Sequence, residues 1–238
     1  MPTVFVSDLS GPCGQAIAGY YLQKGVKVAG LLGKNLPASL ADVVCYDADA
    51  TSEAQCAALA EQLKAAGGVD AMILTSREME ITSVQNGPEE LFDRVLARNT
   101  KTAFFLAKYV GDLMAQSESK GAIVYVGSIH GEKPTGASLA FSCSMGALKM
   151  LNRETALQLG RKGVHTVLIE LGPIQGDEII MDTPLSPIYD GYVQSIPRKQ
   201  PCTFDELCGL VDMAVRTPMI NGAEIRADGG FMLKYADR

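Results

Sequence analysis

Short apolar runs alternate with longer stretches of helical periodicity along the whole chain. The apolar runs predict buried strands at residues 4–6, 27–32, 43–46, 71–74, 121–126, 166–170 and 223–226. Between them, the spacing of apolar positions predicts helices at residues 15–22, 52–66, 89–115, 140–160 and 204–215. Strands that alternate with helices indicate right-handed βαβ crossovers. The pattern therefore predicts an α/β fold with a Rossmann-type, doubly wound, mainly parallel sheet of seven strands and helices on both faces.

The length and composition are those of one globular domain. The chain has 238 residues, of which 47% are hydrophobic and 20% charged, so it can bury a sizeable single core. We expect residues 1–238 to form one domain. The proline-rich segment 172–201 is expected to be a lid-like, irregular insertion.

Charge and composition exclude several classes of function. The net charge of −6 and the pI near 5.0 argue against nucleic acid or an anionic membrane as partner, because both require a basic face. No apolar stretch approaches the length of a membrane span, and the N-terminus lacks the pattern of a signal peptide. The six cysteines have no metal-type spacing and indicate reduced thiols in the cytoplasm. With only His130 and His165 in the chain, no metal site is expected.

The segment around residues 121–145 resembles the catalytic strand and helix of the short-chain dehydrogenase/reductase (SDR) family. An apolar run ends in Ser128, and a long helical pattern continues after residue 145. In that family, a strand-end Ser precedes a Tyr-x-x-x-Lys motif, in which Tyr is the general acid/base and Lys binds the nicotinamide ribose and lowers the pKa of the Tyr. Phe141 stands at the Tyr position and Met145 at the Lys position. The resemblance runs from Val4 to the closing segment 221–230 and implies the family's fold.

Neither Phe141 nor Met145 can take over the chemical role of the residue that it replaces. The phenyl ring of Phe141 carries no transferable proton, and the thioether of Met145 is a weak acceptor without charge. A positioned acid/base typically contributes about 10²–10⁴-fold to a rate. The chain is therefore expected to be about 3–5 kcal/mol short of the family's carbonyl–alcohol redox chemistry and to be inactive alone.

The family's glycine-rich phosphate turn, Thr-Gly-x-x-x-Gly-x-Gly, is also altered. Its counterpart is residues 7–14, in which Asp8 and Pro12 replace two glycines and only Gly14 is kept, for close packing of helix and strand. A carboxylate near a diphosphate would repel it by about 4 kcal/mol at about 4 Å, and Pro12 removes an N–H group. Alternatively, Asp8 turns outward, caps the following helix and leaves the pocket usable.

Other cofactor contacts of the family are changed as well. Leu31, Leu32 and Gly33 offer no ribose acceptor at the end of the second strand, although Lys34 lies beyond. Asp49 matches the family's adenine-contacting Asp, and an N-terminal cap is an equally good interpretation. Arg77 replaces the Gly of Asn-Asn-Ala-Gly and is expected to project into the cofactor trough, or to bind an acidic ligand there. The family's Pro-Gly after the sixth strand is Leu171-Gly172. We therefore expect this chain to bind no cofactor, with NAD in an active partner.

Part of the family's catalytic set remains, but each residue has a structural alternative. Asn99 matches the helix Asn that holds a water in the proton relay, or bonds the backbone of its own helix. Ser128 matches the substrate-orienting Ser, or forms a turn. His130 is a possible substitute acid/base, or a polar loop residue. Tyr189 and Tyr192 in the lid could reach inward, or pack in the core.

These losses favour a non-catalytic SDR subunit that supports an active NAD-dependent alcohol or hydroxyacyl(-CoA) dehydrogenase. In the family, tetramers form when the two long helices, here residues 89–115 and 140–160, pack against their symmetry mates, with a second contact at the last strand. The chain resembles the silent partner in hetero-oligomeric SDR enzymes, for instance the hydroxyacyl-CoA dehydrogenase of anaerobic toluene (benzylsuccinate) breakdown, which implies a heterotetramer.

Two alternatives stay open. The first is a divergent oxidoreductase or non-redox enzyme that keeps Ser128 and Asn99 and recruits His130 or a lid Tyr. The second is a ligand-sensing module that uses the pocket beside Arg77.

Overall fold

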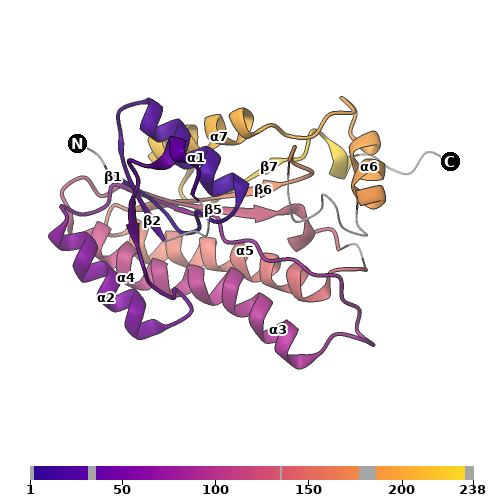
Figure 1. The fold of residues 1–238 in the computed structure, drawn as a ribbon, viewed down its shortest axis with the longest axis horizontal. Helices are drawn as coiled ribbons and strands as arrows, with labels where there is room; N and C mark the ends of the chain where they lie inside the picture. The colour runs from indigo at the N-terminus through magenta and orange to yellow at the C-terminus, as the bar shows by residue number, and fades with distance from the viewer. Residues whose placement is uncertain (1–2, 32–35, 135, 177–185, 234–238) are drawn as a thin grey trace.

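The computed structural model describes residues 3–31, 36–134, 136–176 and 186–233 (Figure 1). Within these residues, a seven-stranded sheet has the order β3-β2-β1-β4-β5-β6-β7, and every neighbouring pair is parallel. The predicted doubly wound fold is confirmed. The strands are β1 (Thr3–Val6), β2 (Lys27–Leu31), β3 (Val44–Tyr46), β4 (Ala71–Leu74), β5 (Ala122–Ser128), β6 (His165–Leu171) and β7 (Ala223–Ala227).

Helices cover both faces of the sheet. Helices α1 and α7 lie on one face, and α2, α4 and α5 lie on the other (Figure 1). The helices are α1 (Pro12–Gln23), α2 (Glu53–Ala65), α3 (Glu89–Leu96), α4 (Thr102–Gln116), α5 (Leu139–Gly160), α6 (Ser186–Ser195) and α7 (Phe204–Arg216). The chain order reverses between β1 and β4, and doubly wound sheets bind their ligands at such a switch point.

Each face of the sheet has its own apolar core, because side chains alternate along a strand. In β1, Phe5 enters the core under α2, α4 and α5, whereas Val4 and Val6 enter the core under α1 and α7. Phe141 and Met145 of α5 belong to the first of these cores. The two positions that the SDR resemblance singles out are therefore packed against the sheet.

The predicted helix over residues 89–115 is divided by a π-helical turn at Ala97–Lys101, between α3 and α4. Thr102 donates its hydroxyl hydrogen bond to the carbonyl of Ala97, over 3.2 Å. Such turns frequently occur at functional sites, and this one contains Asn99, which is buried.

The segment 172–201, expected to be irregular, contains a helix, α6, between its ends. Isolated strand-like pairing joins Ile174 to Cys202 at its base. Residues 177–185 lie outside the described part of the chain.

Two polar side chains of the closing segment 221–230 anchor the C-terminal strand. Asn221 accepts a hydrogen bond from the Thr166 N–H at 2.9 Å and donates one to the Ala156 carbonyl at 3.1 Å. Asp228 accepts hydrogen bonds from the N–H groups of Gly230 and Met232, both at 2.9 Å. The role of these two side chains is to join β7 to β6 and α5 and to shape the following turn.

Among the described residues, no helix has the length and apolarity that crossing a membrane would require. The same residues contain no group of three or more His, Cys, Asp or Glu side chains placed to hold a metal ion.

Candidate functional site

A trough of about 290 Å³ lies at the switch point between β1 and β4. The β1–α1 turn forms one wall, and the segment after β4 together with the π-helical turn forms the other. The lining residues are Asp8, Ser10, Gly11, Pro12, Cys13, Gly14, Thr75, Arg77, Glu78, Met79 and Arg98. The trough is thus built from the segment in which the sequence predicts an altered phosphate turn.

Asp8 stabilises the β1–α1 turn instead of capping the helix. Its Oδ1 accepts a hydrogen bond from the Ser10 N–H at 2.8 Å and a second, short one from the Ser10 hydroxyl. The N-cap residue of α1 is Gly11, without a side-chain cap. Asp8 therefore remains beside the trough, with its other carboxylate oxygen 3.7 Å from the Arg98 guanidinium.

Gly14 is required for packing. A Cβ atom at this position would lie 1.8 Å from the Asp8 carbonyl oxygen, so no larger residue fits without moving the turn. This contact agrees with the interpretation of Gly14 as the glycine that lets helix and strand approach each other.

Two arginines place positive charge at the trough. Arg77 lines it, with Nη1 3.7 Å from the Cys13 Sγ. Arg98, which the sequence interpretation did not consider, lies between Asp8 and Glu78 at 3.7 and 3.8 Å. These two cations balance the two carboxylates that share the trough with them.

The residues proposed for the adenosine end are only partly placed. Asp49 is exposed, and its Oδ1 accepts hydrogen bonds from the hydroxyl and N–H of Thr51 at 2.7 and 2.9 Å, which lower the pKa of the carboxyl. Leu31 closes β2. Leu32, Gly33 and Lys34 lie outside the described residues.

Ser128 and His130 form a hydrogen-bonded pair at the end of β5. Ser128 Oγ lies 2.8 Å from His130 Nδ1, and the His130 N–H donates to the same oxygen at 3.3 Å. The hydroxyl thus serves as the turn-forming group and contacts a titratable ring. Burial and the positive charge of Arg77 lower the pKa of His130 to about 4, so the imidazole is neutral at pH 7.

Acidification is expected to destabilise the protein through His130. Because its pKa is depressed in the folded state from 6.5 to about 4, the unfolded chain binds the proton first as the pH falls below 6.5. The free energy of unfolding should drop by about 2–3 kcal/mol between pH 7 and pH 4.5. His130→Asn should remove this part of the pH dependence, as measured by urea unfolding at each pH. If the free energy of unfolding falls equally with pH in the variant and in the wild type, the assignment of this pH dependence to His130 is contradicted.

Phe141 and Met145 are each only 1% exposed. The Phe141 ring meets the His130 ring edge-on, with centroids 5.4 Å apart. A Cβ on Gly127 would lie 3.9 Å from the Met145 Sδ, which shows how closely that side chain approaches β5. Hydrocarbon and sulfur therefore fill the places where the family has a hydroxyl and an ammonium group.

Asn99 has a structural environment. Its Nδ2 donates to the Glu78 carbonyl at 2.8 Å and to the Ser144 hydroxyl at 2.9 Å, and its Oδ1 accepts from the Glu78 N–H at 2.6 Å. These bonds join the π-helical turn to α5 and to the segment after β4. They favour the structural interpretation of Asn99 over a water relay.

The lid tyrosines also make internal contacts. The Tyr189 hydroxyl donates to the Ile174 carbonyl at 2.7 Å, and the residue is 8% exposed. Tyr192 meets the Phe231 ring edge-on at 5.3 Å. Gly172, after β6, donates its N–H to the Ala227 carbonyl at 3.0 Å. These contacts fit packing of the lid, in which the Tyr189 hydroxyl already bonds a backbone carbonyl.

A charge cluster between α5, β6 and β7 escaped the sequence interpretation. The Lys149 ammonium of α5 lies 2.9 Å from Glu170 and 3.3 Å from both Glu132 and Glu224. Arg153 pairs with Glu224 at 2.7 Å, and Arg226 pairs with Glu132 at 2.6 Å. Lys149 follows Met145 by one helical turn, and this spacing was the only available signal. The cluster joins α5 to β6, β7 and the segment after His130.

Comparison with known proteins decides the family. The family model described as short chain dehydrogenase matches residues 3–182. The chain belongs to the short-chain dehydrogenase family. This SDR chain is 26% identical over 197 residues to glucose 1-dehydrogenase 2 of Bacillus subtilis, covering 80% of this chain and 75% of that protein.

Solved SDR structures share the fold. An aldohexose dehydrogenase of Thermoplasma acidophilum superposes with a TM-score of 0.89 at 17% identity, over 100% of this chain and 96% of that one. A levodione reductase superposes with a TM-score of 0.88 at 19% identity, over 98% of each chain. Both cover the sheet and its helices almost completely.

The expectation that this SDR chain binds no cofactor, with NAD only in a partner, is wrong. The chain matches a family of NAD(P)-binding dehydrogenases, and its fold is that of a solved dehydrogenase and a solved reductase. The expectation treated Asp8 as an uncompensated charge. In the structure, this carboxylate is held by Ser10 and faces Arg98, so the trough is not simply negative.

The residues of the trough fit the phosphates of a dinucleotide. A Cβ on Gly11 would meet no atom of the described residues within 4 Å, so these residues leave the N-terminus of α1 accessible, and a helix N-terminus favours anions. Arg77 and Arg98 add positive charge. A bound nicotinamide dinucleotide would donate or accept a hydride, while Phe141 and Met145 have no proton to exchange with a substrate.

Proposed function

We propose that this SDR chain is a supporting subunit of an oxidoreductase assembly, in which a second SDR subunit carries out the redox chemistry. The observation that carries the proposal is the burial of Phe141 and Met145, each 1% exposed, at the acid/base and ammonium positions. The proposed role concerns proton transfer and is compatible with a dinucleotide in the trough. The expected partner is an NAD-dependent alcohol or hydroxyacyl(-CoA) dehydrogenase in a heterotetramer.

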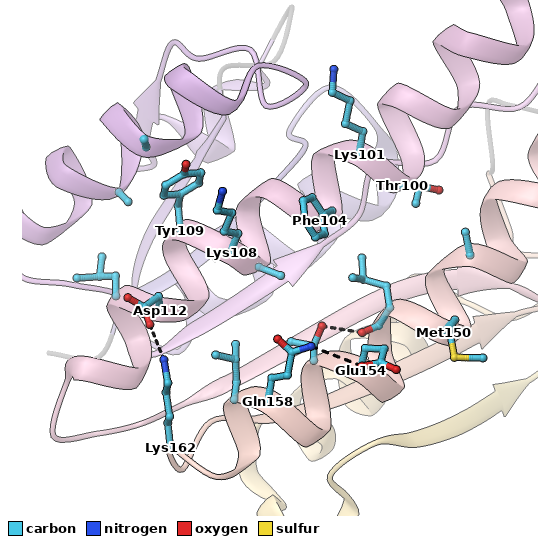
Figure 2. Close-up of a pocket in the computed structure, with 18 of the residues that line it drawn as sticks. Thr100, Lys101, Phe104, Lys108, Tyr109, Asp112, Met150, Glu154, Gln158 and Lys162 are labelled. Carbon is cyan, nitrogen blue, oxygen red and sulfur yellow. Dashed lines mark hydrogen bonds and ion pairs between the residues drawn. The ribbon is translucent and has the colours of Figure 1, made fainter.

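A groove of about 1530 Å³ between α2, α4 and α5 supports this role (Figure 2). Its lining includes apolar side chains that are exposed to solvent, notably Phe104 (48%) and Met150 (53%). Leu157 of α5 is exposed to 64%. Exposed apolar side chains in a groove are typical of an interaction site.

Charged side chains accompany these apolar positions. Lys162 pairs with Asp112 at 2.7 Å, and on α5 Gln158 donates a hydrogen bond to Glu154 at 3.5 Å (Figure 2). An apolar centre with a polar rim is typical of a protein interface. We infer that α4 and α5 form the face that receives the active subunit.

The proposal is tested with the chain purified alone and in complex with the SDR enzyme that co-purifies with it. Oxidation of an alcohol or hydroxyacyl-CoA with NAD should be at least about 10²-fold slower for the chain alone than for the complex. Phe104→Asp should dissociate the complex in native mass spectrometry, because a charge enters an apolar contact. Val44→Asp is the matched control, since Val44 is 41% exposed in the edge strand β3, outside the groove and outside both long helices. Full turnover by the chain alone would refute the proposal.

A divergent oxidoreductase is the second candidate, favoured by the 2.8 Å contact between Ser128 and His130. A neutral imidazole bonded to a hydroxyl could take up a proton from substrate in place of the missing Tyr. This candidate predicts turnover by the chain alone that is lost in His130→Asn. The supporting-subunit proposal predicts no turnover that depends on His130.

A further inference from the structure

Arg98 is a loosely held cation at the trough. Its Nη2 lies 3.7 Å from Asp8 Oδ2 and its Nε lies 3.8 Å from Glu78 Oε2. Charge-assisted hydrogen bonds between guanidinium and carboxylate groups are usually about 2.7–2.9 Å long. The guanidinium therefore attracts both carboxylates but is not locked to either, and its side chain is 48% exposed.

The backbone that carries Arg98 is firmly fixed. Its neighbour Asn99 is 1% exposed and bonded to Glu78 and Ser144. The guanidinium can thus change partners without a movement of the π-helical turn. A fixed backbone with a mobile cation suits a group that exchanges one anion for another.

The turn opposite Arg98 has lost part of its capacity to bind an anion. Asp8 occupies the Ser10 N–H with its own carboxylate, and Pro12 has no N–H to donate. The N-terminus of α1 stays accessible at Gly11. A phosphate placed here needs another donor, and Arg98 lines the same trough.

We propose that Arg98 is a phosphate ligand of the dinucleotide and that Asp8 is its counter-ion while the trough is empty. On binding, the guanidinium leaves Asp8 for the diphosphate, which replaces the N–H contacts missing from the turn. Asp8 then acts as an internal competitor that lowers affinity. The assignment does not depend on the supporting-subunit role, because it concerns binding and not turnover.

The proposal predicts effects of opposite sign for the two partners. Isothermal titration with NADH and with ADP-ribose, which carries the diphosphate without nicotinamide, should give a Kd about ten- to a hundredfold higher for Arg98→Gln. Arg98→Lys keeps the charge but loses the planar guanidinium group, so its Kd should lie between those of the wild type and Arg98→Gln. Asp8→Asn keeps the acceptor for Ser10 and removes the charge, and should lower the Kd by about tenfold at low salt.

Arg161→Gln is the matched control, because it removes the same charge at the exposed C-cap of α5, and it should leave the Kd within about twofold of wild type. Circular dichroism and thermal unfolding confirm that each variant is folded. The proposal is overturned if Arg98→Gln and Arg161→Gln bind ADP-ribose equally well, if Asp8→Asn weakens binding, or if the wild type takes up neither ligand at millimolar concentration. A purely structural Asp8–Arg98 pair would lower the thermal stability of both variants and leave both Kd values unchanged.

Discussion

Replacing Lys149 with Met is expected to lower the free energy of unfolding at pH 7 by about 3–5 kcal/mol, because it leaves a buried carboxylate without its cation. The Glu170 side chain is only 3% exposed and lies 2.9 Å from the Lys149 ammonium. Glu132 and Glu224 would lose a shared partner as well. Chemical denaturation with urea measures the change. An unaltered dependence of the free energy of unfolding on urea concentration shows that the folded state is preserved.

Lys162→Met provides the control for this prediction. Lys162 also forms a short ion pair, at 2.7 Å from Asp112, but both side chains are about half exposed, at 53% and 46%. Exposed pairs of this kind contribute about 0–1 kcal/mol. Equal losses in the two variants would mean that the burial of Glu170 has no energetic consequence.

The pH dependence of the stability that the Lys149 cluster provides follows from two pKa shifts of opposite direction. Burial lowers the pKa of Lys149, but the hydrogen bond and charge of Glu170, together with Glu224 and Glu132, outweigh it, so the pKa is raised above its ordinary 10.5. The stabilisation that protonated Lys149 gives the fold is complete below pH 10.5 and is lost as the pH rises through the raised pKa. The Arg226 hydrogen bond lowers the pKa of Glu132 below 4.5, so its contribution is lost only in acid. The stability gap between the wild type and Lys149→Met should thus be widest between about pH 5 and pH 10.

The fold could be predicted from the sequence because strand and helix signals alternate along the chain without interruption. The extra residue of the π-helical turn at Ala97–Lys101 could not, since apolar periodicity continues across it. Its position depends on tertiary contacts, such as those of Asn99 with Glu78 and Ser144.

The candidate site could be predicted only where one residue decides the chemistry. Phe141 and Met145 are informative alone, because no surroundings can give them a proton or a charge. Asp8 is different, since its effect on an anion depends on Arg98, which approaches it from a distant part of the chain. The same holds for Lys149, whose three carboxylate partners come from separate segments. The net charge of a site depends on residues that are distant in the sequence. The cofactor expectation was wrong because it considered Asp8 without Arg98.

Helix α5 combines the altered chemistry with the stability of the fold. Phe141, Met145 and Lys149 follow one another at intervals of four residues and lie on the same side of the helix. The first two enter the apolar core and the third enters the charge cluster. Replacement of the catalytic pair is therefore built into the contact between α5 and the sheet.

Restoring the family's lysine by Met145→Lys is expected to destabilise the protein by about 3–5 kcal/mol at pH 7, because an ammonium group would enter an apolar core without a partner. Met145 is 1% exposed, and its backbone lies 2.9 Å from the position that a Cβ on Gly131 would occupy. Met145→Leu, which conserves volume and polarity, should cost less than about 1.5 kcal/mol. Urea unfolding compares the two, and a stable Met145→Lys variant would show that the core can open to solvate the charge.

The response to acid separates this variant from Lys149→Met. A lysine at position 145 would have a depressed pKa in the folded state, because burial disfavours its charged form. Its destabilisation is then complete below the depressed pKa and disappears only as the pH rises toward about 10.4, so acid brings no relief. The loss of stability in Lys149→Met should instead diminish in acid, where Glu132 becomes protonated. Parallel pH profiles for the two variants would contradict the assignment of one position to an apolar core and the other to a charge cluster.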